Sequence, residues 1–130
     1  MTPSEAYEKC LKQGSRNPEL ESIILQDPRW SYRYACNVIK GRWVEGEGVI
    51  LQSSEWSYCY AYDVVRGRWV EGEASILQDP GWSYCYALSV VRGRWVEAEE
   101  IILGSEWESV YCNHFGIESC ELIPKPDYTL

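Results

Sequence analysis

The chain has 130 residues and a formal net charge of −8 at pH 7, with 45% hydrophobic and 25% charged residues. This composition is typical of one globular domain and excludes a disordered chain. The acidic balance opposes a protein that coats phosphates, and no apolar run approaches the roughly 20 residues of a membrane span. Because residues 1–10 contain two Glu and no apolar stretch, we expect no signal peptide there and a cytoplasmic location.

A segment of 26 residues repeats along the chain. Gly-Arg-Trp occurs at 41–43, 67–69 and 93–95, and Trp-Ser-Tyr begins at Trp30, Trp56 and Trp82. The copies degrade near residues 15–19 and after Trp107, as capping repeats do because only one of their sides is buried. We expect one helical-repeat domain over residues 1–117, with a cap helix at 1–14 and repeats over about 15–117, and an extended C-terminal tail over 118–130.

The first predicted helix starts in a capping box at Thr2 and ends at Gly14. Each copy then contributes a short helix, such as Val44 to Leu51, and a longer helix that starts at Asp27, Ser53 or Asp79. We expect the longer helices to end in left-handed glycines at Gly41, Gly67 and Gly93, after last-turn bases that favour the helix dipole, namely Lys40, Arg66 and Arg92. The small residues at positions 46, 72 and 98 predict close approach between helices.

The fold class that follows is all-α. It is a short α-solenoid of alternating long and short antiparallel helices, with about four 26-residue repeats and degenerate caps. A β-propeller or β-solenoid is the alternative, because the aromatic residues of Trp-Ser-Tyr-x-Tyr alternate as in a strand. The same segment continues with helical spacing and begins with Asp-Pro, which favours the helix.

The segments at 34–47, 60–73 and 86–99 share the pattern Tyr-Ala-x-x-Val-(Ile/Val)-(Lys/Arg)-Gly-Arg-Trp-Val-Glu-(Gly/Ala)-Glu. This pattern resembles a short α-helical repeat of uncharacterised proteins from bacteriophages and large DNA viruses, over roughly residues 15–115. Those proteins often have Pro after the Trp, where Val44, Val70 and Val96 stand here. The resemblance implies a helical-repeat fold and a place in the cytoplasm of a host cell, and it transfers no functional residues.

Tryptophan and cysteine follow the repeat. We interpret the seven Trp as core residues, and the alternative is an exposed row that stacks on bases or on a peptide. Equivalent positions of stacked helices lie about 9–10 Å apart, whereas a disulfide requires less than about 7 Å between Cα atoms. The six Cys are therefore expected to be free thiols rather than a disulfide framework. With His114 as the only His, no metal site, cofactor or catalytic pair is expected.

Two charge patterns stand out. Arg16, Arg42, Arg68 and Arg94 each precede a Glu by three residues, which predicts a ladder of ion pairs along the domain. The excess of acidic over basic residues lies toward the C-terminus, because six acids and one base occur from Glu100 onward.

Comparison between the copies separates constant from variable positions on the longer helices. The variable positions are 29/55/81, 33/59/85, 36/62/88 and 37/63/89, which fall on one helical stripe that faces solvent or a partner. We call these positions the variable stripe. With the acidic end, it gives the candidate partner-binding residues Arg29, Arg33, Glu55, Tyr62, Asp63, Leu88, Glu100, Glu106 and Glu108.

These observations favour a non-enzymatic protein-interaction module. By analogy with anti-CRISPR and anti-restriction proteins, we expect a phage-encoded inhibitor that binds a host protein, such as a CRISPR or restriction nuclease, through an acidic surface. The alternative is a helical-repeat nucleic-acid-binding protein that uses its Arg and Trp rows, which the net charge makes unfavourable. An enzyme is the third class, and no residue pattern supports it.

Overall fold

In the computed structural model, residues 1–118 are described, and all their regular elements are helical. This confirms the all-α prediction and makes the β-propeller and β-solenoid alternatives wrong for that part of the chain. Apart from Glu118, the predicted C-terminal tail lies outside the described residues.

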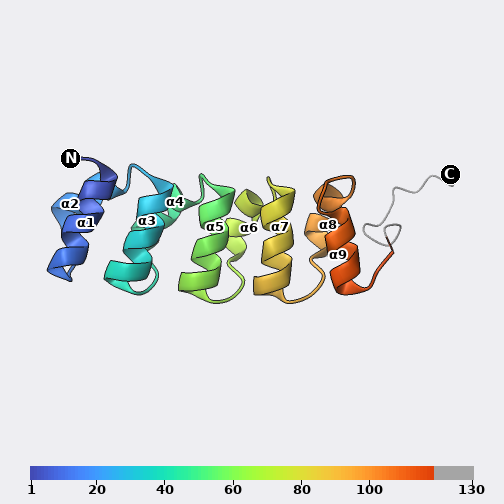
Figure 1. Cartoon of the computed structure of the whole chain (residues 1–130). Helices are drawn as coiled ribbons and strands as arrows, with labels where there is room; N and C mark the ends of the chain where they lie inside the picture. The colour runs from blue at the N-terminus through green and yellow to red at the C-terminus, as the bar shows by residue number, and fades with distance from the viewer. Residues whose placement is uncertain (119–130) are drawn as a thin grey trace.

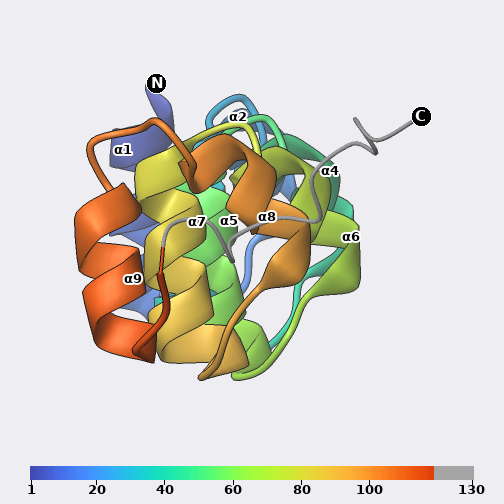
Figure 2. The same ribbon diagram turned by 90° about the vertical axis from the view of Figure 1, so that its right-hand side faces the viewer.

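The helices form two rows (Figure 1). The first row holds α1 (Pro3–Gln13), α3 (Pro28–Tyr34), α5 (Ser54–Tyr60), α7 (Pro80–Tyr86) and α9 (Glu108–Phe115). The second row holds α2 (Pro18–Ile24), α4 (Val44–Ile50), α6 (Val70–Ile76) and α8 (Val96–Ile102). Helix α3 packs against α1, α4 and α5, and α5 packs in the same way against α3, α6 and α7. The end-on view shows the two rows side by side (Figure 2).

The helix starts agree with the sequence prediction. Thr2 and Glu5 form the capping box at the start of α1. The side chains of Asp27, Ser53 and Asp79 accept hydrogen bonds from backbone N–H groups in the first turns of α3, α5 and α7. A side-chain oxygen at this position pairs a donor that the helix leaves open, so short polar residues fix these starts locally.

The ends of the longer helices differ from the prediction. Three π-helical segments, η1 (Ala35–Ile39), η2 (Ala61–Val65) and η3 (Ala87–Val91), continue α3, α5 and α7. The left-handed residue that follows each segment is the base and not the glycine, at Lys40, Arg66 and Arg92, with φ of 62°, 61° and 60°. In η1 the Lys40 N–H donates to the Ala35 carbonyl five residues back, at 2.8 Å. This wider turn places the reversal of the chain one residue before the expected glycine.

The tryptophans divide into two groups. Trp43, Trp69 and Trp95, at the starts of the short helices, are 1% exposed and form the core with Tyr34, Tyr60, Tyr86 and Tyr111. The tryptophans of the first row and of the turn before α9 are only partly buried and pack against this core, so the core assignment holds only in part for them. Each instead contacts a tyrosine of the preceding long helix, as Trp56 does with Tyr32 at 5.5 Å between ring centroids.

The small residues of the short helices have a different cause from the one predicted. A Cβ added at Gly46 would lie 2.4 Å from Cε3 of Trp43, and one at Gly72 would lie 2.3 Å from the same atom of Trp69. The close approach is thus to the indole ring at the start of the same helix, not to a second helix.

Candidate functional site

The predicted charge ladder exists with different partners. Arg42 Nε lies 2.9 Å from Glu47 Oε2, five residues on, whereas the expected partner Glu45 is exposed. The Tyr60 hydroxyl donates to the same Glu47 carboxylate at 2.6 Å and accepts the Trp43 N–H at 2.9 Å. We call this arrangement the Tyr–Glu–Arg staple, because it joins a short helix to the next long helix. The other three staples are Arg16–Glu21–Tyr34, Arg68–Glu73–Tyr86 and Arg94–Glu99–Tyr111.

The Arg and Glu residues of the staples have a structural role, because they pair with each other inside the protein. The hydrogen bond from Arg16 lowers the pKa of Glu21. Burial, and then the hydrogen bond to Glu47, raises the pKa of Tyr60, so this hydroxyl stays protonated and keeps donating. Groups already paired inside the protein contribute little to recognition, so the functional surface is expected among the residues outside the staples.

The first two predicted bases meet at one indole ring. The guanidinium carbons of Arg29 and Arg33 lie 5.0 and 5.3 Å from the centroid of the Trp30 ring, and Arg29 also lies 5.9 Å from the Trp56 ring. Cation–π contacts of this kind hold the two side chains against α3 and α5. The variable stripe is therefore basic at its N-terminal end.

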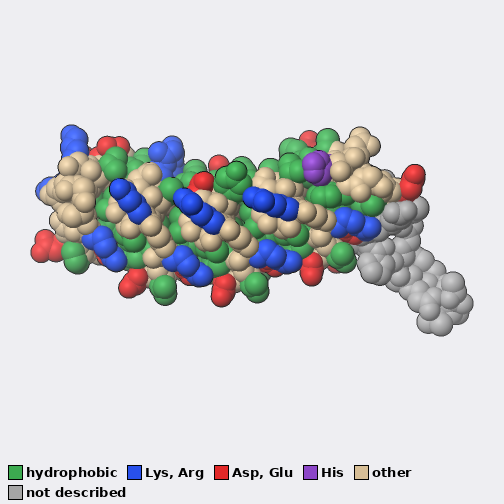
Figure 3. All heavy atoms as spheres, turned by 90° about the horizontal axis from the view of Figure 1, so that it is seen from below, with side chains coloured by type: hydrophobic (Ala, Val, Ile, Leu, Met, Phe, Trp, Pro, Cys, Tyr) green, Lys and Arg blue, Asp and Glu red, His purple; other side chains and the backbone are tan. Residues whose placement is uncertain are grey.

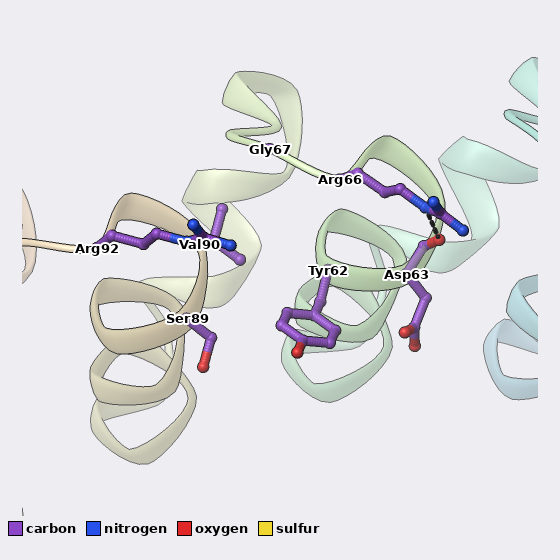
Figure 4. Close-up of a pocket in the computed structure, with 7 residues that line it drawn as sticks. All are labelled: Tyr62, Asp63, Arg66, Gly67, Ser89, Val90 and Arg92. Carbon is purple, nitrogen blue, oxygen red and sulfur yellow. Dashed lines mark hydrogen bonds between the residues drawn. The ribbon is translucent and has the colours of Figure 1, made fainter.

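Tyr62 and Asp63 line a surface cleft of about 510 Å³ between η2 and η3 (Figure 4). Its other lining residues are Arg66, Gly67, Ser89, Val90 and Arg92. The Tyr62 side chain is 51% exposed, and its ring stacks on Tyr58 at 6.1 Å between centroids. Asp63 accepts a hydrogen bond from the Tyr32 hydroxyl of the preceding long helix. We call this space the second cleft.

The same arrangement occurs one copy earlier, in what we call the first cleft. It has about 500 Å³ and is lined by Cys36, Asn37, Lys40, Gly41, Asp63, Val64 and Arg66. Asp63 and Arg66 thus border both clefts. A smaller cleft of about 300 Å³ lies at the other end of the long helices, where Glu106 meets Gly81, Trp82, Cys85, Trp107 and Asp79.

The remaining predicted residues are spread over both rows of helices. Glu55 is exposed on α5 and Glu100 is exposed on α8, in the second row of helices. Leu88 is partly covered within η3. The Glu108 carboxylate accepts the Gly104 N–H at 2.7 Å, so it has a local structural role at the start of α9.

Sequence reasoning missed Lys40, Arg66 and Arg92 as site residues, because it assigned them to the helix dipole. The spacing of 26 could have placed them in one row, but it could not show that each borders a cleft, which requires two neighbouring copies. Viewed from below, the molecule shows Lys and Arg side chains in rows along one face (Figure 3). The missed bases are exposed, and no ion pair is found for them in the described part of the chain.

The cysteines offer weak nucleophiles. Cys10, Cys36, Cys59 and Cys85 are free thiols. Burial raises the pKa of Cys59 to about 11, so its reactive thiolate form is scarce at neutral pH. Within residues 1–118 no group of three or more His, Cys, Asp or Glu is placed to hold a metal ion.

Comparison of the chain with protein-family models, curated proteins and solved structures finds no match. No helix within residues 1–118 has both the length and the apolar character that crossing a membrane requires.

Proposed function

We propose that the chain is a non-enzymatic protein-interaction module, built as a short α-solenoid of about four 26-residue repeats with degenerate caps. It binds a protein partner through the variable stripe and the clefts that border it. One observation carries this proposal. Of the twelve positions of the variable stripe, four are exposed, seven are half-buried and only Gly81 is buried, whereas the Trp and Ile of the short helices and one constant Tyr of each long helix fill the core.

The constant residues have structural duties that fix them. Trp69 is enclosed, Tyr86 joins α6 to α7 through a staple, and Ser83 donates to the Ile76 carbonyl at 2.9 Å. Tyr62 has no equivalent duty, because Cys36 and Leu88 occupy its place in the other copies. A half-exposed tyrosine at a variable position beside a cleft is a suitable anchor for a protein contact.

The proposed partner is a host protein, and the proposed effect is inhibition of a nucleic-acid enzyme such as a CRISPR or restriction nuclease. The support is the resemblance to phage and viral repeats together with exposed acids. Glu55, Glu100 and Glu106 are all exposed, and acids on a rigid frame can complement a basic groove.

Site-specific photo-crosslinking tests the interface. A photoreactive side chain is placed at Tyr62, and the matched control carries it at Glu45, which is exposed on the second row. In a bacterial lysate, we expect one discrete adduct from position 62 and none from position 45. Equal adducts from both positions would contradict the assignment of the interface.

The acidic mechanism has its own test with the captured partner. Glu55→Lys with Glu106→Lys should weaken binding and flatten its salt dependence, because exposed charges steer association and are screened by salt. Glu45→Lys with Glu71→Lys makes the same charge change on exposed acids of the second row and should have the smaller effect. Unchanged affinity in the first pair would remove the acidic competitor from consideration.

Direct nucleic-acid binding is the second candidate, and the row of exposed bases at Lys40, Arg66 and Arg92 favours it. A gel shift of a labelled single strand at physiological salt separates the candidates. If the chain binds nucleic acid, Arg29→Ala with Arg33→Ala should weaken the shift, and removal of acids should strengthen it.

A further inference from the structure

Within residues 1–118, the five long helices all end at a residue with positive φ, but the residue type differs between inner and outer copies. Gly14 ends α1 with φ 69°, and Gly116 ends α9 with φ 64°. The three inner helices end at Lys40, Arg66 and Arg92. Gly14 stands 26 residues before Lys40, so the same repeat position holds glycine in a cap and a base in each inner copy.

A base is not what this backbone favours. A left-handed conformation brings the Cβ of an ordinary residue close to the following carbonyl, and glycine avoids that contact. Folding alone would therefore favour glycine at all five positions. Strained backbone that recurs at equivalent positions points to a use of the side chain.

The helix dipole does not explain the bases. A cation near a helix C-terminus is favourable, but α1 places Lys12 in its last turn and still ends at Gly14. The benefit is thus available without a strained base. Within residues 1–118, the one hydrogen bond found for these three side chains runs from Arg66 Nε to the Asp63 carbonyl, at 3.4 Å.

We propose that Lys40, Arg66 and Arg92 form an anion-binding row that receives the carboxylates of an extended acidic segment of a partner protein. The inference rests on the proposed protein-binding function and names the chemistry of one contact. Arg66 and Arg92 border the second cleft, and Lys40 and Arg66 border the first. Arginine presents a planar fork of donors that pairs with a carboxylate in two-point contact.

Each cleft suits one isolated charge. Asp63 borders both clefts, so each combines two bases with one acid. A nucleic acid has closely spaced phosphates, and it binds along such a surface with aromatic stacking under successive bases. Tyr62 lines the second cleft, but Cys36 takes its place in the first. A peptide with separated carboxylates fits this pattern better.

The spacing selects a peptide form. Packed helices lie about 8–10 Å apart, so neighbouring bases of the row are separated by a similar distance. A polyproline II segment has three residues per turn and rises about 3.1 Å per residue. Acids at every third residue then face one side at intervals of about 9 Å.

The test uses the full chain and a fluorescent peptide of Glu-Pro-Pro repeats, with a Gln-Pro-Pro peptide of equal length as the uncharged control. Fluorescence anisotropy should show salt-sensitive binding of the first peptide and none of the second. Arg66→Gly with Arg92→Gly should weaken binding by about tenfold or more, because charge-assisted hydrogen bonds are lost. The same variant should melt at or above the parent temperature, since glycine relieves the backbone.

Two further variants keep the proposal falsifiable. Lys9→Gln with Lys12→Gln removes the same charge from exposed positions of α1 and should leave peptide affinity within about twofold of the parent, because distant surface charges are screened. Asp63→Asn removes the carboxylate shared by both clefts and should strengthen binding. If Arg66→Gly with Arg92→Gly folds poorly, Arg66→Gln with Arg92→Gln gives the same comparison.

Each outcome of these measurements either supports or overturns the proposed anion-binding row. Equal losses in the arginine and lysine pairs would reduce the effect to net charge and overturn the row. Tighter binding of a single-stranded oligonucleotide than of the Glu-Pro-Pro peptide would overturn the choice of ligand in favour of nucleic acid. A crosslink at position 62 without peptide binding leaves the proposed function standing and overturns this inference. Peptide binding without a crosslink at position 62 would leave this inference standing and overturn the proposed function.

Discussion

At the scale of single residues, one side-chain type has two roles in this chain. Trp69 is enclosed by the core, with its ring 4.8 Å from that of Tyr60 between centroids. Trp56, thirteen residues earlier, lies partly buried on the outer row beside Tyr32. The even spacing of the tryptophans in the sequence conceals this difference, because burial depends on which row of helices holds the residue.

We therefore expect unequal costs of truncation. Trp69→Ala should lower the free energy of unfolding by about 3–5 kcal/mol, since it removes a large enclosed side chain. Trp56→Ala should cost about 1–2 kcal/mol, since only part of its surface is buried. Urea unfolding followed by circular dichroism measures both. Equal losses would contradict the division of the tryptophans into two groups.

The cysteines give a second prediction at this scale. All six thiols should react with a thiol reagent after denaturation without reductant, because Cys10, Cys36, Cys59 and Cys85 are free and equivalent positions of stacked helices lie too far apart for a disulfide. In the native state the reaction should be slow at neutral pH, because Cys10 and Cys112 are buried and burial raises the pKa of Cys59. A count of four or fewer in the denatured chain would indicate a disulfide.

At the scale of the helices, local chemistry determines the starts and not the ends. The N-caps at Thr2, Asp27 and Asp79 are readable in sequence because a cap acts within three residues. The π-helical ends are not readable, because no capping side chain marks the start of η1, η2 or η3. The Arg–Glu partners were also misjudged. Trp43 has extended backbone, so spacing counted along a helix does not apply to the residue before it.

The staple of the first copy predicts a loss of stability in acid. The pKa of Glu21 is lowered from its ordinary 4.5 by Arg16, so the unfolded chain binds a proton more readily than the folded one. Its contribution is complete above pH 4.5 and is lost as pH falls through the lower folded pKa. Urea midpoints measured across this range should fall in acid, and Glu21→Gln should reduce the slope.

The tyrosines of the staples predict the opposite trend in alkali. Burial and a hydrogen bond to Glu raise the pKa of Tyr34, Tyr60, Tyr86 and Tyr111 above the ordinary 10. Their contribution is complete below pH 10 and is lost as pH rises toward the folded values. Ultraviolet absorbance should show these phenols ionising together with unfolding. Ionisation of these four phenols at pH 10 in a fully folded protein would contradict the burial of their hydroxyls.

At the scale of the whole molecule, the repeat makes fold class and element order predictable from this one sequence. The clefts were not predictable, because their walls come from two successive copies. The copy-to-copy comparison did find Tyr62 and Asp63, since residues without a structural duty are free to vary. It does not find Arg66 and Arg92, because a base occupies that position in every inner copy. A residue type that is constant between copies is assigned a structural role by this comparison.

Deletion of one inner copy tests whether the units are interchangeable. Removal of residues 54–79 joins Ser53 to Pro80. Because Ser53 and Asp79 occupy equivalent positions of the repeat, this junction keeps the register of the original Asp79–Pro80 bond. Because each unit contacts mainly its neighbours, we expect an equally helical product with a lower urea midpoint. Circular dichroism and urea unfolding provide both measurements. Loss of helicity would show that the copies differ in structural role.

The staples also determine how the chain carries mechanical load. Each one joins a short helix to the next long helix, so tension applied at Thr2 and Glu118 passes through four staples in series. The 26-residue unit behind a broken staple would lengthen to about 90 Å when fully extended, at about 3.5 Å per residue. In an optical trap the protein should therefore extend in evenly sized steps, with one 26-residue unit unfolding in each step.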